Sequence, residues 1–391
     1  MNARAIIYNL MIIGAMLLAG CSHDDVTIDI TPSEPVAISF MPTLSPTLAE
    51  GEEMTRAGQP GVMNSEDLRT TGFGVFASLN ENKTPDMMYN QEVKFTFVGD
   101  IDKPDPDDPL KGYWSYQPLK YWPTGLTSES DFYISAYAPY QNLPIDPSGT
   151  GIIGISANNE APYIDYRRCE KPDEMVDLLW YYDKPNSIPA ATSDLAAGTQ
   201  KIEMRHALAR LEINVALATA PASGTKVLIE KITLKGEMAK EGRLHLYEQE
   251  PYPAPPATPT KFYPIWDNLT YDATDHTITI KNSEDDDSYG IIDSQVRYID
   301  GLPYAWQPAG LTTTLQNALS TGDRKTYVYL IPQDKLELTV KVKYHIVTTT
   351  SDVTKSSIES TVRIPKLTDE DPILRGNIPY ALNITLSGVS N

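Results

Sequence analysis

Apolar and polar residues alternate along much of this chain, in short runs separated by segments rich in turn-forming residues. The clearest run carries apolar side chains at every second position: Leu336, Leu338, Val340, Val342, Tyr344 and Ile346. A second run does the same at Tyr380, Leu382, Ile384 and Leu386. Strict alternation predicts half-buried β-strands, because successive side chains of a strand point to opposite faces. Many such strands at regular spacing predict an all-β protein built of antiparallel β-sandwiches.

A change of composition near the middle of the chain predicts two domains. Residues 184–199 are rich in Pro, Ala, Ser, Thr and Gly, which is typical of a domain boundary. A chain of 391 residues also exceeds one ordinary core and suits about two domains. We therefore expect one sandwich over residues 57–199 and a second over residues 200–391. Only residues 312–320 have a helical pattern, and that segment is short.

An early strand and a loop precede the first expected domain. Val36, Ile38 and Phe40 alternate with small or polar residues, which predicts a half-buried strand. Residues 41–61 hold three Pro residues and an acidic run, so they predict an exposed loop. Exposed loops are where proteases cut, and this loop contains Arg56.

The N-terminal residues form a lipoprotein signal pattern. Residues 5–20 are mostly apolar, Arg4 is the only charge before them, and Leu-Ala-Gly stands directly before Cys21. A run of 16 residues matches a signal-peptide core and is shorter than the about 20 residues of a transmembrane helix. The pattern resembles a bacterial lipobox, so we expect a signal peptide over residues 1–20 and a lipid on Cys21. The alternatives are an ordinary secretory signal with a chance Cys, or a short anchor helix.

The residues after Cys21 suggest where in the cell envelope the protein is sent. The sequence Ser-His-Asp-Asp at residues 22–25 resembles the acidic tags that send some lipoproteins to the outer face of the outer membrane. The alternative is the solvated start of a tether. We expect residues 21–56 to be a propeptide made of this tether and the early strand.

Charge and cysteine content exclude two classes of protein. The formal net charge is −20, and it becomes −21 once the signal peptide with Arg4 is removed. Such a surface repels nucleic acids, and no basic cluster interrupts it. If Cys21 carries a lipid, Cys169 is the only thiol left, so no intramolecular disulfide can form. Stability must then come from packed cores and not from a disulfide scaffold.

No catalytic, cofactor-binding or metal-binding site is predicted. The five His residues are scattered, and His206 is expected to be a packed side chain satisfied by backbone groups. Residues 149–154 match G-x-G-x-x-G, but Pro147 precedes them and no helical pattern follows, so we expect a Gly-rich turn. The acidic segments 100–108 and 284–287 are expected to be solvated loops and not calcium sites. We therefore expect a protein that is not an enzyme.

Several short pieces, taken in order, resemble the fimbrillin family, the pilins of type V pili. The pieces are the lipobox at Cys21, Ile38-Ser39-Phe40, Thr55-Arg56-Ala57, Phe73-Gly74-Val75-Phe76-Ala77, Lys120-Tyr121-Trp122-Pro123, Phe132 to Pro139, Asp177-Leu178-Leu179, His206 to Leu211, and Asn377 to Tyr380 with the final strand. They cover most of the expected mature chain. Each piece is weak alone, and their order and spacing carry the resemblance.

The resemblance implies a fold and an assembly mechanism. The fold would be two transthyretin-like, Greek-key β-sandwiches behind a lipidated tether. The precursor would be held on the outer membrane by its lipid until an arginine-specific protease cuts after Arg56, leaving Ala57 first. Arg69 is a second candidate for the cut. Loss of the early strand, with Val36, Ile38 and Phe40, would open a groove for a strand of another pilin subunit, in a homo- or heteropolymer. The product would be a cell-surface fimbria that supports adhesion to a host or bacterial ligand.

Two other functions stay open from the sequence. One is a surface lipoprotein that binds glycans through aromatic residues: Trp114, Tyr116, Tyr121, Trp122 and the stretch from Tyr163 to Tyr166. The other is an uncleaved anchor of the pilus. The strand at Tyr380 to Leu386 suits either a donor strand or the closing strand of the second domain, which leaves shaft, tip and anchor roles open.

Overall fold

The structure is a computed structural model, and its residues from Val36 onward form one compact unit. The described residues are 35–45, 63–98, 112–127, 129–157, 160–189, 198–218, 225–251, 262–281, 290–292, 305–306, 327–348, 351–356, 360–363 and 373–386. Among them, no helix has the length and apolar character needed to cross a membrane. Outside them lie Cys21, Arg56, Ala57, the acidic segments 100–108 and 284–287, and the expected helix at 312–320.

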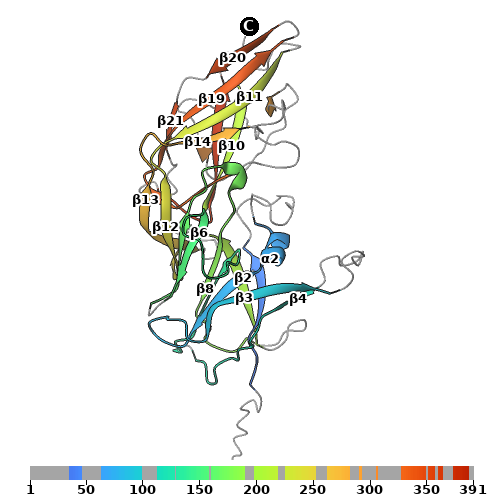
Figure 1. Cartoon of the computed structure of the whole chain (residues 1–391), viewed down its shortest axis with the longest axis vertical. Coiled ribbons are helices and arrows are strands. Elements are labelled where there is room, and N and C mark those ends of the chain that lie inside the picture. Colours follow the sequence, from blue (N-terminus) through green and yellow to red (C-terminus); the bar gives the residue numbers. More distant parts are fainter. Residues whose placement is uncertain are drawn as a thin grey trace, which may run out of the picture. The chain divides into compact units, whose positions relative to one another are not determined.

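The predicted all-β class with antiparallel sheets is confirmed. The first sheet has seven strands among the described residues, in the order β1-β9-β8-β5-β2-β3-β4. Their bounds are β1 Ser39–Leu44, β2 Phe73–Ser78, β3 Met88–Phe97, β4 Gly112–Ser115, β5 Tyr133–Ala138, β8 Leu179–Asp183 and β9 Thr199–His206. Neighbouring strands are antiparallel, except that β1 runs parallel to β9. In Figure 1, β2, β3 and β4 lie side by side.

The central strands of this sheet are buried on both faces. In β2, Phe73 and Val75 belong to one cluster of buried side chains, and Phe76 belongs to another. In β8, Leu179 and Trp180 divide between the two clusters in the same way. A strand covered on both sides needs apolar residues throughout, and β2 and β5 are buried at every position. This explains why most successive positions of both strands are apolar, with Ser78 and Ser135 as buried exceptions.

The remaining strands form further sheets. One has the order β13-β12-β7-β6, with bounds β6 Gly151–Ser156, β7 Tyr163–Arg167, β12 Ala239–Pro251 and β13 Phe262–Tyr271. Another has the order β14-β11-β19-β20, with β15 on β11 and β21 on β19. Its bounds are β11 Lys226–Lys235, β14 Thr277–Lys281, β15 Gly290–Ile292, β19 Glu337–Val347, β20 Asp352–Ser356 and β21 Ser360–Arg363. Figure 1 shows β11, β19 and β20 side by side in yellow to red.

One nearly continuous strand runs from the first sheet into another. β9 ends at His206, and β10 (Ala209–Leu217) begins three residues later in the sheet β16-β23-β10-β17. The other bounds there are β16 Ala305–Trp306, β17 Tyr327–Leu330 and β23 Pro379–Leu386, and a small pair joins β18 Gln333–Asp334 to β22 Ile373–Leu374. β23 runs parallel to β10, as β1 does to β9. β12, from the second expected domain, pairs with β7, from the first. Strand pairing therefore crosses the predicted boundary between residues 199 and 200. The two-domain division stays a prediction.

Three local expectations differ from the structure. The loop predicted from residue 41 begins later, because residues 41–44 continue β1, where Pro42 is tolerated on an edge strand. A short helix, α2 (Ser65–Thr71), was not predicted, although Asn64 and Asp67 form a capping box at its start. Residues 149–154 were expected to form a Gly-rich turn, but from Gly151 onward they belong to strand β6. With a strand there and not a helix N-terminus, the segment lacks the geometry of a dinucleotide site.

Candidate functional site

The N-terminal strand lies in a slot between two backbone edges. On one side, residues of β1 pair in parallel with β9, from Ser39 opposite Thr199 to Leu44 opposite Met204. On the other side, Ala37 forms an antiparallel bridge with Tyr121. The bridge has two backbone hydrogen bonds of 2.8 Å, from the Ile38 amide to the Lys120 carbonyl and from the Trp122 amide to the Val36 carbonyl. Residues 36–44 therefore connect two backbone edges, that of β9 and that of the 120–122 segment.

The predicted apolar residues of this strand share one face. Ile38 is 1% exposed and Phe40 is 5% exposed, while Val36 is partly buried against the same cluster. The Phe40 ring lies 6.2 Å from the Phe73 ring and 5.5 Å from the Tyr116 ring, between centroids. The sequence therefore predicted the inward face of the strand correctly.

Tyr116 and Trp122 form polar contacts at the wall of the slot. The Tyr116 hydroxyl donates to the Ile38 carbonyl at 2.8 Å and accepts from the Lys120 amide at 3.2 Å. Burial raises the pKa of Tyr116, so its hydroxyl stays protonated and able to donate. The Trp122 indole donates to the Gly198 carbonyl at 2.6 Å. From the sequence, both rings were glycan-binding candidates with core or strand-edge packing as the alternative, and Trp122 was also part of the family resemblance.

On the opposite face of the strand, a hydroxyl pair fixes its position. Ser39 Oγ lies 2.7 Å from Thr199 Oγ1. The Ser39 amide also donates to the Gly198 carbonyl at 3.2 Å, and the Ser45 amide donates to the Met204 carbonyl at 2.7 Å. These contacts set the register of β1 against β9, because a shift of one residue would turn Ile38 and Phe40 away from the core.

Gly198 is the tightest point of the slot. Its φ is +86°, and a Cβ there would lie 2.5 Å from Val36 Cγ1 and 2.7 Å from the Ala37 oxygen. We expect Gly198→Ala to lower the free energy of unfolding by about 1–3 kcal/mol, from backbone strain and overpacking together. Gly125→Ala is the matched control, because Gly125 has φ +74° and no atom within 4 Å of the added Cβ. Urea unfolding of both variants measures the difference, and equal losses would contradict a role for close packing.

Of the two candidate cleavage residues, Arg69 lies in the described part of the structure and Arg56 lies outside it. Arg69 lies in α2, where its guanidinium stacks over Phe95 at 5.2 Å from the ring centroid. A residue held in a helix is a poor protease substrate, because cleavage needs an extended and accessible chain. Arg56 and Ala57 lie outside the described residues, between Ser45 and Met63. The cut after Arg56 therefore stays a prediction.

The aromatic residues considered for glycan binding do not form one platform. Tyr116, Trp122 and Tyr166 are buried, and Tyr121 is exposed. Trp114 is half-buried, and its ring is tilted by 60° to Phe73 and by 64° to Phe95. The Arg243 guanidinium lies 3.5 Å from the Tyr163 ring centroid, so it covers a face of that ring. Stacking on a sugar needs an accessible ring face, which most of these residues do not offer.

The titratable candidates lie away from the slot's apolar face. His206, at the end of β9, has Nδ1 2.5 Å from Asp177 Oδ2, so a buried carboxylate satisfies it and not the expected backbone groups. Cys169 is buried. Among the described residues, Glu170, Asp272 and His276 have ligand atoms within 4.8 Å of one another. Arg168 is ion-paired with Asp272, and its positive charge opposes a metal cation there.

Three solved structures are similar to most of this chain. A fimbrial protein from Bacteroides vulgatus has 20% identity and a TM-score of 0.47, covering 90% of this chain and 95% of that one. Candidate cell adhesion proteins from Bacteroides uniformis and Bacteroides ovatus have 12% and 13% identity, with TM-scores of 0.39 and 0.35. Each of these two matches covers 90% of this chain. The match spans 93% of the Bacteroides uniformis protein and 92% of the Bacteroides ovatus protein. At these values the likeness alone does not assign this chain to their class. No protein-family model matches the chain, and no curated protein matches it.

Proposed function

We propose that this chain is the precursor of a structural subunit of a cell-surface fimbria. In this proposal it is exported as a lipoprotein through Cys21 and cut after Arg56, and it polymerises when a strand of another subunit replaces β1. The observation that carries the proposal is the slot. Residues 36–45 lie on the N-terminal side of Arg56, so a cut there leaves them held only by non-covalent contacts.

Loss of β1 would leave a surface that needs a new strand. Ile38 and Phe40 cover part of an apolar cluster that includes Phe73 and Ile202. Their removal would expose these side chains together with the unpaired backbone edges of β9 and the 120–122 segment. An open edge beside an apolar groove is the arrangement that β-strand addition uses. In this proposal, other subunits of the fimbria supply the new strand on the cell surface.

The C-terminal strand is engaged in its own subunit. β23 pairs with β10 over eight residues and with β16 over two, and Tyr380 and Leu382 are buried. Donation of β23 to a neighbour would therefore remove the parallel partner of β10. This favours another segment of the partner subunit as the strand that fills the slot.

A disulfide lock tests the proposal in the full chain. Ser39 and Thr199 are opposite one another with their hydroxyl oxygens 2.7 Å apart, so Ser39→Cys with Thr199→Cys is expected to tie β1 to β9. An arginine-specific protease should convert the unlocked chain to one that starts at Ala57 and forms a ladder of polymers on a gel. The locked chain should be cut at the same place, keep residues 36–45, and polymerise only after reduction.

The controls separate cleavage from strand exchange. Ser39→Cys alone should polymerise like the original chain, and Arg56→Ala should stay uncut. N-terminal sequencing and intact mass report the cut and the retained segment. Polymers formed by the locked, oxidised chain would reject strand exchange. An intact lipid-bearing chain recovered from surface fimbriae would reject the polymerising subunit and support the uncleaved anchor.

A further inference from the structure

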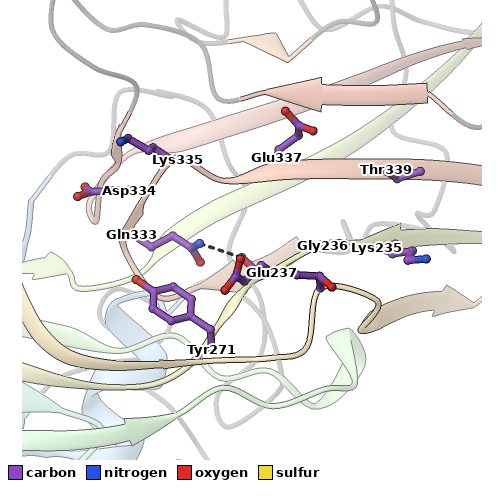
Figure 2. A pocket seen from close by; sticks show the side chains of 10 residues that line it. Lys235, Gly236, Glu237, Tyr271, Gln333, Asp334, Lys335, Glu337 and Thr339 are labelled. Atoms are coloured by element: carbon purple, nitrogen blue, oxygen red, sulfur yellow. Dashed lines mark hydrogen bonds between the residues drawn. The ribbon is translucent and has the colours of Figure 1, made fainter.

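A second candidate site lies in a pocket far along the chain from the slot residues of β1. The pocket has a volume of about 410 Å³. It lies where the end of β11, the end of β13 and the start of β19 meet. Figure 2 shows the 333–339 segment on one side and Lys235, Gly236, Glu237 and Tyr271 on the other. This volume falls within the range of about 300–1,000 Å³ that is typical of small-molecule sites.

The floor of the pocket is held by a buried amide. Gln333 Oε1 accepts from the Ala239 amide at 2.6 Å, and its Nε2 donates to the Glu237 carbonyl at 3.0 Å, the dashed line in Figure 2. The Gly236 amide donates to the His276 carbonyl at 3.2 Å. A Cβ on Gly236 would lie 2.5 Å from the Glu337 carbonyl oxygen, so only glycine permits this close approach. The backbone at the base of the pocket is therefore fixed before any ligand arrives.

Tyr271 offers an aromatic ring on this fixed base. It is the last residue of β13, opposite Ala239, and the next residue is anchored by the Asp272 amide donating to the Met238 carbonyl at 3.0 Å. Tyr271 is 44% exposed, although its neighbour in the chain is held by a backbone hydrogen bond. Partial burial raises the pKa of Tyr271, and the nearby Asp334 and Glu237 carboxylates raise it further. The hydroxyl thus stays neutral at physiological pH, close to both acids.

The lining of the pocket carries charges of both signs. Lys235 and Lys335 supply ammonium donors, and Glu237, Asp334 and Glu337 supply carboxylate acceptors. The Glu337 carboxylate is already paired with Arg363 at 2.5 Å, and the rest of the lining carries two lysines and two acids. An anion would meet the acids and a cation would meet the lysines. A neutral ligand with many hydroxyl groups can use both, because each hydroxyl donates and accepts.

From the fixed floor, the exposed ring and the balanced charges, we propose that this pocket binds a neutral carbohydrate. The Tyr271 ring would pack against the apolar C–H face of one sugar unit. Glu237 and Asp334 would accept hydrogen bonds from its hydroxyls, and Lys335 would donate one. This site is independent of strand exchange, since among the described residues its lining shares no strand pairing and no backbone hydrogen bond with β1.

Saturation-transfer NMR on the full chain tests this proposal. The probes are the methyl glycosides of glucose, galactose, mannose, fucose and N-acetylglucosamine, with glucuronate and glucosamine as charged comparisons. We expect transfer to at least one neutral glycoside at millimolar concentration, stronger than to either charged sugar. Tyr271→Ala should weaken that binding at least tenfold, whereas Tyr271→Phe should retain most of it.

Tyr89→Ala is the matched control, because Tyr89 is also 44% exposed but lies on β3. It should leave the signal unchanged, and far-UV circular dichroism checks that each variant is folded. No transfer to any of the neutral glycosides at 10 mM would overturn the proposal. So would a signal that survives Tyr271→Ala, or a clear preference for glucuronate or glucosamine. Because each result is independent of protease treatment, failure here leaves the pilin proposal standing.

Discussion

Phe40→Ala is expected to lower the free energy of unfolding of the full chain by about 3–5 kcal/mol, the cost of emptying a large aromatic site in a packed core. The side chain is nearly fully buried, and its ring packs against Phe73 and Tyr116. The cavity would lie between β1 and the body of the first sheet, where the backbone is held on both sides and cannot readily collapse. Urea unfolding followed by tryptophan fluorescence measures the loss, since Trp122 lies at the same slot.

Thr43→Ala is the control for this prediction. Thr43 lies on the same strand but is exposed, so its truncation should change the stability by less than about 0.5 kcal/mol. After cleavage, Phe40→Ala should also speed the release of residues 36–45, because the same contacts hold the segment in both states. A loss below about 1 kcal/mol for Phe40→Ala would show that β1 contributes little to the fold and would weaken the slot interpretation.

Asp272→Ala is expected to lower the free energy of unfolding by about 3–5 kcal/mol, because it leaves the buried Arg168 guanidinium without its ion-pair partner. The Arg168 side chain is 1% exposed and that of Asp272 is 4% exposed. Arg168 Nε also donates to the Ala239 carbonyl at 3.2 Å, so the group is tied to β12 and cannot move to solvent easily. The pair links the end of β7 to the turn after β13, and its loss should loosen both. Thermal and urea unfolding measure the change.

The double variant Arg168→Met with Asp272→Ala separates charge from packing. It should be more stable than Asp272→Ala alone, because no uncompensated charge remains buried. Glu174→Ala is the exposed control. Its partner Lys171 lies 2.7 Å away, but both side chains are more than half exposed, so the change should be below about 1 kcal/mol. A double variant as unstable as Asp272→Ala would mean that packing, and not charge, dominates.

Where only one face of a strand is covered, the alternation of apolar and polar residues was enough to predict the strand. β19 was predicted from its apolar positions, and Leu338, Val340 and Val342 are buried as expected. The period-two signal is absent from β2 and β5, since both faces are covered. In the sequence these segments stood out as pieces of the family resemblance, Phe73 to Ala77 and Phe132 to Pro139. The inward face of the N-terminal segment 36–44, which contains β1, was predicted from Val36, Ile38 and Phe40. Its extent was not, because Pro42 is typical of loops and the pairing with β9 bridges about 160 residues.

The walls of the slot could not be found from the sequence. Tyr116, Trp122 and Gly198 come from separate segments, and only the folded chain brings their polar groups to one strand. The same holds for the pocket, where the Gln333 side chain and the Tyr271 backbone are both held by the 237–239 segment, through contacts that have no local sequence pattern. Helix α2 did have a local signal, Asn64 with Asp67 three residues later, but a seven-residue helix offers too few positions to show a period.

The parallel seating of β1 has a mechanical consequence. A strand in this slot is hydrogen-bonded along its length to β9 and, near Val36, to the 120–122 segment as well. Tension along the strand axis would load those bonds together in shear and would not peel them apart one by one. The load would pass into β9 and, through residues 207 and 208, on to β10 in the next sheet. A filament joined in this way would resist flow through many bonds strained at once.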